Sequence, residues 1–145
     1  MKKDHLNSTD FNLWHTIREE TEAEPMLASF LHQTVLRHDS LDSVLAYHLS
    51  SKLGSPIMDV RALFEIYQQA LSADTRISKC VEADLKAIYE RDPACDEYSL
   101  PLLYFKGFHA IQAHRINHWL YQNGRKTLAY FLQNRMSEVF GVDIH

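Results

Sequence analysis

The most constraining feature of this chain is the spacing of its apolar residues, which recur every three or four positions along almost its entire length. This period places apolar side chains on one face of an α-helix and excludes the alternating pattern of a half-buried strand. Two of the clearest stripes are Leu27, Phe30, Leu31 and Val35, and Leu128, Leu132, Met136 and Val139. The pattern predicts an all-α fold.

Capping and breaking residues divide the pattern into separate helices. Aspartate and serine accept hydrogen bonds from free backbone N–H groups at helix starts, and proline fits the first helical turn. The residues expected to open helices are Asp10, Pro25, Ser40, Asp59 and Asp74. A helix over residues 41–53 is expected to end at Gly54 in the left-handed conformation, and one over 75–91 is expected to end before Pro93.

A loop, "DPACDEYS", separates these helices from the longest apolar pattern, at residues 102–122, and from a last helix at 125–140. The apolar residues of 102–122 cover more than half of the circumference of their helix, wider than an ordinary surface helix needs. That helix therefore lies at the centre of the bundle or also contacts another subunit. Residues 1–140 are predicted to form a bundle of about seven or eight helices.

Composition excludes several classes of protein. The 145 residues suffice for one domain with a substantial core. With 15 Lys and Arg against 19 Asp and Glu, the net charge of −4 gives no basic surface for nucleic acid or anionic lipid. The longest apolar run, "LPLLYF", is too short to cross a membrane. Cys80 and Cys95 are too few for a disulfide framework, which indicates free thiols in a reducing cytoplasm.

The last six residues, "FGVDIH", break the helical pattern. After Gly141, the apolar residues Val142 and Ile144 alternate with Asp143 and His145, which is the period of a strand. Residues 141–145 are therefore expected to begin a strand rather than to extend the last helix.

Three histidines in "GFHAIQAHRINHWL" raise the possibility of a metal site. On a helix, however, His109 lies about 140° around the axis from His114 and about 180° from His118, so one ion cannot bind all three. His114 and His118 share a face, but a zinc site needs a third ligand and the H-E-x-x-H motif is missing. A packing or interface helix is the better interpretation, and no metal ligand is assigned.

Asp92, in "YERDPACDEYS", has two possible roles. It can cap the turn that starts at Pro93, since Asp before Pro is a common start of a helical turn. Alternatively, its carboxylate can bind a cationic group of a ligand, because loops between rigid elements commonly carry binding residues.

Several segments together resemble a known family. "EPMLASFLHQTVLRH", "LSSKLGSPIM", "RDPACDEYSLPLLYFKGFHAIQAHRINHWL" and "FGVDIH" resemble, in order and spacing, the N-terminal helical domain of bacterial serine acetyltransferases. The resemblance runs from about Glu24 to His145, and it is most specific from Arg91 to Leu120. His114, at a position where the family is expected to have an aromatic residue, departs from it.

The resemblance implies an enzyme that acetylates the hydroxyl of L-serine with acetyl-CoA to give O-acetylserine for cysteine biosynthesis. It implies that the helical domain precedes a left-handed parallel β-helix of hexapeptide repeats, which forms trimers and holds acetyl-CoA between subunits. The helical domains join trimers into a hexamer, a C-terminal tail binds cysteine synthase, and cysteine inhibits at the serine site. Residues 141–145 would then begin that β-helix.

Two aspartates correspond to functional positions of the family. Asp92, in the R-D-P loop, is implied to lie near the amino group of serine, and Asp143, in the V-D-I-H segment, to orient the catalytic histidine. That histidine, the remaining serine-binding groups and the acetyl-CoA site lie beyond this segment in the family, and His145 does not replace them. These 145 residues alone are therefore expected to be inactive and to bind no cofactor. The alternative is a free-standing helical module that retains self-association without catalysis.

Overall fold

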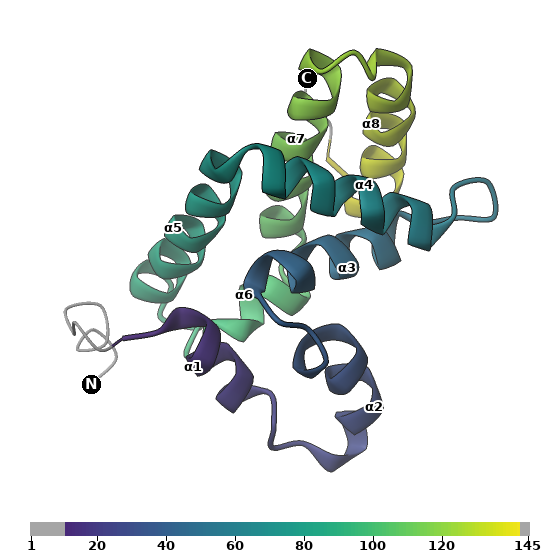
Figure 1. Cartoon of the computed structure of the whole chain (residues 1–145). Helices are drawn as coiled ribbons and strands as arrows, with labels where there is room; N and C mark the ends of the chain where they lie inside the picture. Colours follow the sequence, from purple (N-terminus) through teal and green to yellow (C-terminus); the bar gives the residue numbers. More distant parts are fainter. Residues whose placement is uncertain (1–10, 143–145) are drawn as a thin grey trace.

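The computed structural model describes residues 11–142, which contain eight α-helices and no strand (Figure 1). This confirms the predicted all-α bundle. The elements are α1 Leu13–Glu20, η2 Pro25–Leu27, α2 Ala28–Leu31, η3 His32–Leu36, α3 Leu41–Leu53, α4 Val60–Ala73, α5 Thr75–Arg91, α6 Ser99–Tyr104, α7 Lys106–Gln122 and α8 Lys126–Phe140. Within residues 11–142, none of the helices is both long and apolar enough to span a bilayer.

Most of the predicted helix starts are confirmed, with one correction. Ser40, Asp59 and Asp74 cap α3, α4 and α5 with their side-chain oxygens. The cap of α1 is Asn12, whose Oδ1 accepts a 2.9 Å hydrogen bond from the His15 N–H. The prediction of a cap at Asp10 is therefore wrong, because the capping side chain must directly precede the first helical residue.

The segment that starts at Pro25 is helical throughout but not uniformly so. A 3₁₀ turn, η2, leads into one turn of α-helix, α2, and then into a π-helical turn, η3. The Glu24 carboxylate accepts a 2.8 Å hydrogen bond from the Met26 N–H and caps the first of these turns. The predicted helical segment is therefore present, while its backbone hydrogen bonds change from the 3₁₀ to the α and then to the π pattern.

Gly54 ends α3, but not in the expected left-handed conformation. Its φ of −61° and ψ of 156° are open to other residues. Space requires the glycine here, since a Cβ at this position would lie 2.4 Å from Cγ2 of Val60. The prediction of a left-handed end was wrong because the close approach of α4 is a tertiary contact.

The long apolar pattern at 102–122 does not form one helix. Phe105 is extended, with φ −90° and ψ 108°, and it separates α6 from α7. Two buried imidazoles bind carbonyl groups at this break: His109 Nε2 lies 2.7 Å from the Leu102 oxygen, and His48 Nε2 lies 2.8 Å from the Leu103 oxygen. These contacts give hydrogen-bond partners to backbone carbonyl groups that would otherwise be buried without one. The break between α6 and α7 therefore does not carry the free-energy cost of unpaired carbonyl groups.

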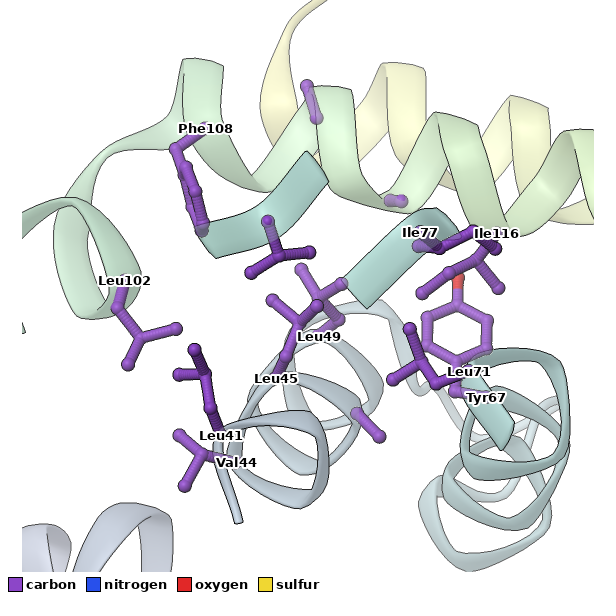
Figure 2. Close-up of a cluster of buried hydrophobic side chains, with 14 of the residues drawn as sticks. Leu41, Val44, Leu45, Leu49, Tyr67, Leu71, Ile77, Leu102, Phe108 and Ile116 are labelled. Carbon is purple, nitrogen blue, oxygen red and sulfur yellow. The ribbon is translucent and has the colours of Figure 1, made fainter. Parts of the chain in front are cut away.

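The core lies where α3 and α4 meet α7, and α8 packs along α7 (Figure 1). Figure 2 shows leucines of α3 facing Tyr67 and Leu71 of α4, with Phe108 and Ile116 of α7 closing the cluster. Helix α7 contacts α4, α5, α6 and α8, which explains why its apolar residues cover so much of its circumference. The alternative of a central position for this helix is thus confirmed.

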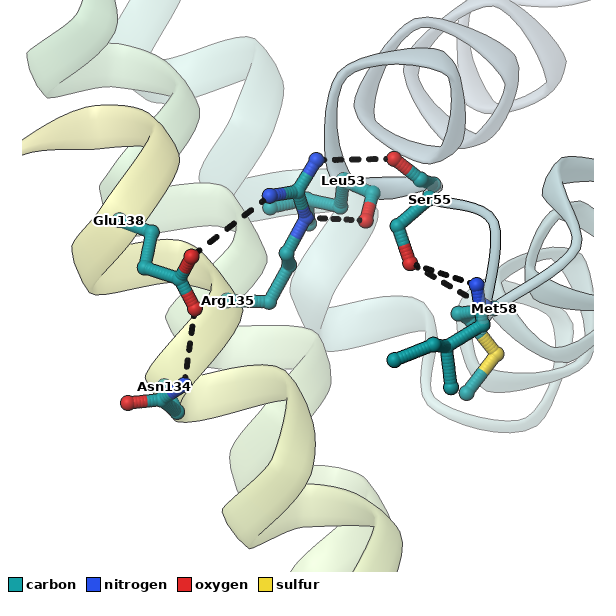
Figure 3. A network of polar contacts seen from close by, with 8 residues as sticks. Leu53, Ser55, Met58, Asn134, Arg135 and Glu138 are labelled. Carbon is teal, nitrogen blue, oxygen red and sulfur yellow. Dashed lines mark hydrogen bonds and ion pairs between the residues drawn. The ribbon is translucent and has the colours of Figure 1, made fainter.

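Arg135 of α8 joins the last helix to the end of α3 (Figure 3). Its guanidinium donates 2.9 Å hydrogen bonds to the carbonyl oxygens of Leu53 and Gly54. These carbonyls have no partner within α3, so the arginine acts as a C-terminal cap supplied by another helix. Helix α8 ends at Phe140, and its C-cap residue Gly141 is left-handed, with a φ of 71°. The strand expected from Asp143 lies outside the described residues.

Candidate functional site

The loop between α5 and α6 holds Asp92 in a defined position. Helix α5 ends at Arg91, and the Asp92 N–H still donates to the Ile88 carbonyl at 2.9 Å. Asp92 Oδ1 accepts a 2.9 Å hydrogen bond from the Ala94 N–H, and its carbonyl oxygen accepts one of 3.0 Å from Cys95 N–H. The predicted capping role of Asp92 is therefore confirmed.

The half-buried Asp92 side chain also lines an open groove of about 550 Å³. Neither function excludes the other, because a carboxylate has about four acceptor positions. The groove combines an apolar wall with charged groups at the helix end. It is lined by Ala87, Ile88, Arg91, Asp92, Pro93 and Phe105. The groove therefore offers the Asp92 carboxylate to a cationic group of a ligand, and the Arg91 guanidinium lines the same groove.

The far end of the loop is held by contacts from outside it. The rings of Tyr98 and Tyr89 stack with their centroids 3.9 Å apart, and Phe11 lies 5.5 Å from Tyr98. The Glu20 carboxylate accepts hydrogen bonds from the N–H groups of Tyr98 at 3.0 Å and Ser99 at 2.8 Å. Nothing in the sequence signals the contacts of Glu20, because the partners are 78 and 79 residues apart.

Acidic groups shape the electrostatics of this loop. Burial, together with the charges of Glu20 and Asp96, raises the pKa of the Glu97 carboxyl above its usual value. Burial and the neighbouring Tyr89 and Glu20 raise the pKa of the Tyr98 phenol to about 12. The charges of Glu20 and Asp96 thus make the surroundings of this loop negative, which favours a positively charged ligand over an anion.

The end of α8 lies beside the start of α7. The rings of Phe140 and His109 lie 6.0 Å apart, and the His109 N–H donates to the carbonyl of Phe105, which lines the groove. The segment with Asp143 follows directly after this helix end, but Asp143 itself is outside the described residues. The structure therefore describes the surroundings of Asp92 and the end of the helix that precedes Asp143.

The three histidines of α7 have separate surroundings. His109 is buried, and burial lowers its pKa to about 4, while its Nε2 bonds to the Leu102 carbonyl. His114 and His118 line a different pocket, of about 310 Å³, together with Asn117, Tyr121, Ala129, Tyr130 and Gln133. Across residues 11–142, no three His, Cys, Asp or Glu side chains converge in a group able to hold a metal ion.

Comparisons with known proteins agree with this geometry. Residues 13–113 match the family described as serine acetyltransferase, N-terminal. The serine acetyltransferase of Escherichia coli K12 is 50% identical over 137 residues, which cover 92% of this chain and 50% of that protein. A crystal structure of Neisseria gonorrhoeae serine acetyltransferase in complex with serine is 88% identical with a TM-score of 0.94, covering 99% of this chain and 60% of that one. A Brucella abortus serine acetyltransferase in complex with coenzyme A is 42% identical with a TM-score of 0.88, covering 92% of this chain and 55% of that one.

The eight-helix fold and its carboxylate loop define the class as the helical N-terminal region of an acetyltransferase. The chain belongs to the serine acetyltransferase family, and the matched region is the N-terminal domain of that family. It spans about half of the length of the Escherichia coli relative.

Proposed function

We propose that this chain is the N-terminal part of a serine O-acetyltransferase, which transfers the acetyl group of acetyl-CoA to the hydroxyl of L-serine and yields O-acetylserine for cysteine biosynthesis. The observation that carries the proposal is the 88% identity, over 99% of this chain, to an enzyme crystallised with serine. The coenzyme A complex of the Brucella abortus relative supports acetyl-CoA as the second substrate. We assign no acetyl-CoA contact to residues 11–142.

In this proposal, Asp92 binds the ammonium group of serine. An ion pair with a half-buried carboxylate orients the amino acid, and the same residue keeps its capping bond to Ala94. Rigid placement matters, because misplacing a substrate by about 1 Å can cost about a hundredfold in rate. The fixed turn around Asp92 supports this role.

Asp143 is proposed to orient the imidazole that accepts the proton of the serine hydroxyl. A carboxylate bonded to one ring nitrogen selects the tautomer whose other nitrogen is free to accept a proton. The histidine in question belongs to the segment that follows in the family. The α8 end packs against His109, and His109 bonds to Phe105, which lines the Asp92 groove; these contacts support a shared site for the two aspartates.

The proposal extends to assembly and location. We propose that the helical domain takes part in a hexamer, that cysteine synthase binds a tail in the second half of the enzyme, and that the protein works in the cytoplasm. Support for self-association comes from large apolar side chains on α6, α7 and α8 that are more than a third exposed. These are Tyr104, Ile111, Tyr121, Tyr130 and Phe131.

A fusion enzyme tests the proposal. Residues 1–140 of this chain are joined to the second half of the Neisseria gonorrhoeae enzyme, and CoA release from acetyl-CoA is followed with and without L-serine. We expect serine-dependent acetyl transfer by the fusion and none by the 145-residue chain alone. An inactive but folded and assembled fusion would refute the proposed function.

The variant Asp92→Asn then tests the role of the carboxylate, because the amide oxygen still caps the turn while the charge is lost. We expect the KM for serine to rise about 10- to 100-fold, as loss of a charged hydrogen bond of 1.5–3 kcal/mol predicts. The matched control is Asp96→Asn, an exposed residue of the same loop, which should leave the KM within about twofold. An unchanged KM in Asp92→Asn would contradict the assignment.

A further inference from the structure

Helix α6 starts without a cap of its own. No side-chain hydrogen bond of its N-cap residue, Tyr98, satisfies the first backbone N–H groups. Glu20, the last residue of α1, supplies the acceptors: Oε2 binds the Tyr98 N–H at 3.0 Å and Oε1 binds the Ser99 N–H at 2.8 Å. Both carboxylate oxygens are thus committed to the point where the Asp92 loop joins α6.

Contacts within the loop connect the residues bound by Glu20 to Asp92. On one side, the Tyr98 ring stacks on Tyr89, which lies two residues before the end of α5. On the other side, the buried Cys95 thiol donates to the Glu97 carbonyl at 3.3 Å, and the Cys95 N–H donates to the Asp92 carbonyl at 3.0 Å. The segment from Asp92 to Ser99 is therefore fixed at the α5 end by its own turn and at the α6 end by Glu20.

We propose that Glu20 is a positioning residue of the serine site: its carboxylate clamps the Tyr98–Ser99 backbone and thereby holds the loop that presents Asp92 to the substrate. This inference rests on the proposed function. Glu20 touches no substrate in it; it acts through the loop. Charge-assisted bonds from a carboxylate to two backbone N–H groups are stronger than neutral ones, so a single side chain is sufficient for this restraint.

Glu20 has a matched control one residue away. Glu19 also lies in the last turn of α1, but its side chain is 63% exposed, and its ion-pair partner is His15 of the same helix. Replacing Glu19 removes one negative charge from the same helix end without touching the loop. A difference between Glu20 and Glu19 variants therefore reports the clamp and not the net charge of α1.

The test uses the fusion enzyme described above with Glu20→Ala, Glu20→Gln and Glu19→Ala. In Glu20→Ala we expect the KM for serine to rise about tenfold, while kcat and the KM for acetyl-CoA stay within about twofold, because in the proposal Asp92 supplies binding energy to serine alone and does not take part in the chemical step. Glu20→Gln keeps one oxygen acceptor and should recover part of the serine KM. Glu19→Ala should match the parent fusion.

Hydrogen exchange of the same fusion, measured by mass spectrometry on the peptide covering residues 92–100, supplies a structural readout. Exchange should accelerate in Glu20→Ala, less in Glu20→Gln and not in Glu19→Ala. Normal serine kinetics in Glu20→Ala would overturn the inference, whatever the exchange shows. An equal loss in kcat and in both KM values, or in all three variants, would also overturn it, since that marks a general structural defect. An inactive parent fusion would instead refute the proposed function on which the inference depends.

Discussion

Two buried histidines should make this fold sensitive to mild acid. The rings of His48 and His109 lie 5.2 Å apart, and each side chain is at least 95% buried, with relative exposures of 5% and 1%. Burial is the main cause that lowers the pKa of each imidazole to about 4, and the charge of Lys52 acts in the same direction on both. In the unfolded chain the pKa returns to about 6.5. The unfolded state therefore binds more protons than the folded state between these two values.

The sign and the size of the effect follow from this difference. The two neutral imidazoles make their full contribution to the free energy of unfolding above pH 6.5. This contribution falls as the pH drops from 6.5 toward 4, and it does not change further below pH 4. At pH 5, a pKa shift from 6.5 to about 4 corresponds to a loss of about 2 kcal/mol for each imidazole. The pair should thus cost about 4 kcal/mol, a large part of the 5–15 kcal/mol that usually stabilises a domain.

The assay is urea unfolding of the 145-residue chain at pH 7.5 and pH 5.0, followed by circular dichroism. The control is the double variant His48→Gln and His109→Gln, in which the amide nitrogen takes the place of Nε2 as donor to the Leu103 and Leu102 carbonyls. The double variant should lose about 4 kcal/mol less than the parent between the two pH values. Equal losses would refute the reasoning, because they would assign the acid sensitivity to carboxylates common to both proteins.

Two further predictions concern the end of α3. Gly54→Ala places a Cβ 2.4 Å from Val60 Cγ2 and should lower the free energy of unfolding by about 1–3 kcal/mol, whereas Gly107→Ala, with no atom within 4 Å, should be neutral or stabilising in urea titrations. If the two variants unfold at the same urea concentration, the close approach of α4 is not what requires Gly54. Arg135→Met removes both bonds to the α3 carbonyls and should cost about 1.5–3 kcal/mol in the same titration. The control is Glu138→Gln, because the Glu138 carboxylate lies 3.9 Å from the Arg135 guanidinium and its side chain is 59% exposed, so this ion pair should contribute little. If Glu138→Gln lowers the free energy of unfolding as much as Arg135→Met does, the capping role of Arg135 is contradicted.

The helix pattern was predictable because it depends on neighbours within one turn. The stripes at three and four residues, and the caps at Ser40, Asp59 and Asp74, need only local hydrogen bonds and a common apolar face. The same holds for the candidate site, where Pro93 ends α5 and leaves Asp92 at a turn. The proposed binding role of Asp92 comes from the family resemblance, since a capping aspartate and a ligand-binding one look alike in sequence.

By itself, then, the sequence determined the all-α class, most helix boundaries and the position of Asp92 in the turn that follows α5. Only the tertiary structure decided where the long apolar pattern breaks, because His48 reaches the Leu103 carbonyl at the break from 55 residues away in the chain. It alone decided that Glu20 holds the Asp92 loop, across 78 residues of chain. The physical reason is the same in both cases: a buried backbone group must find a partner, and the folded chain supplies that partner from any distance along the sequence.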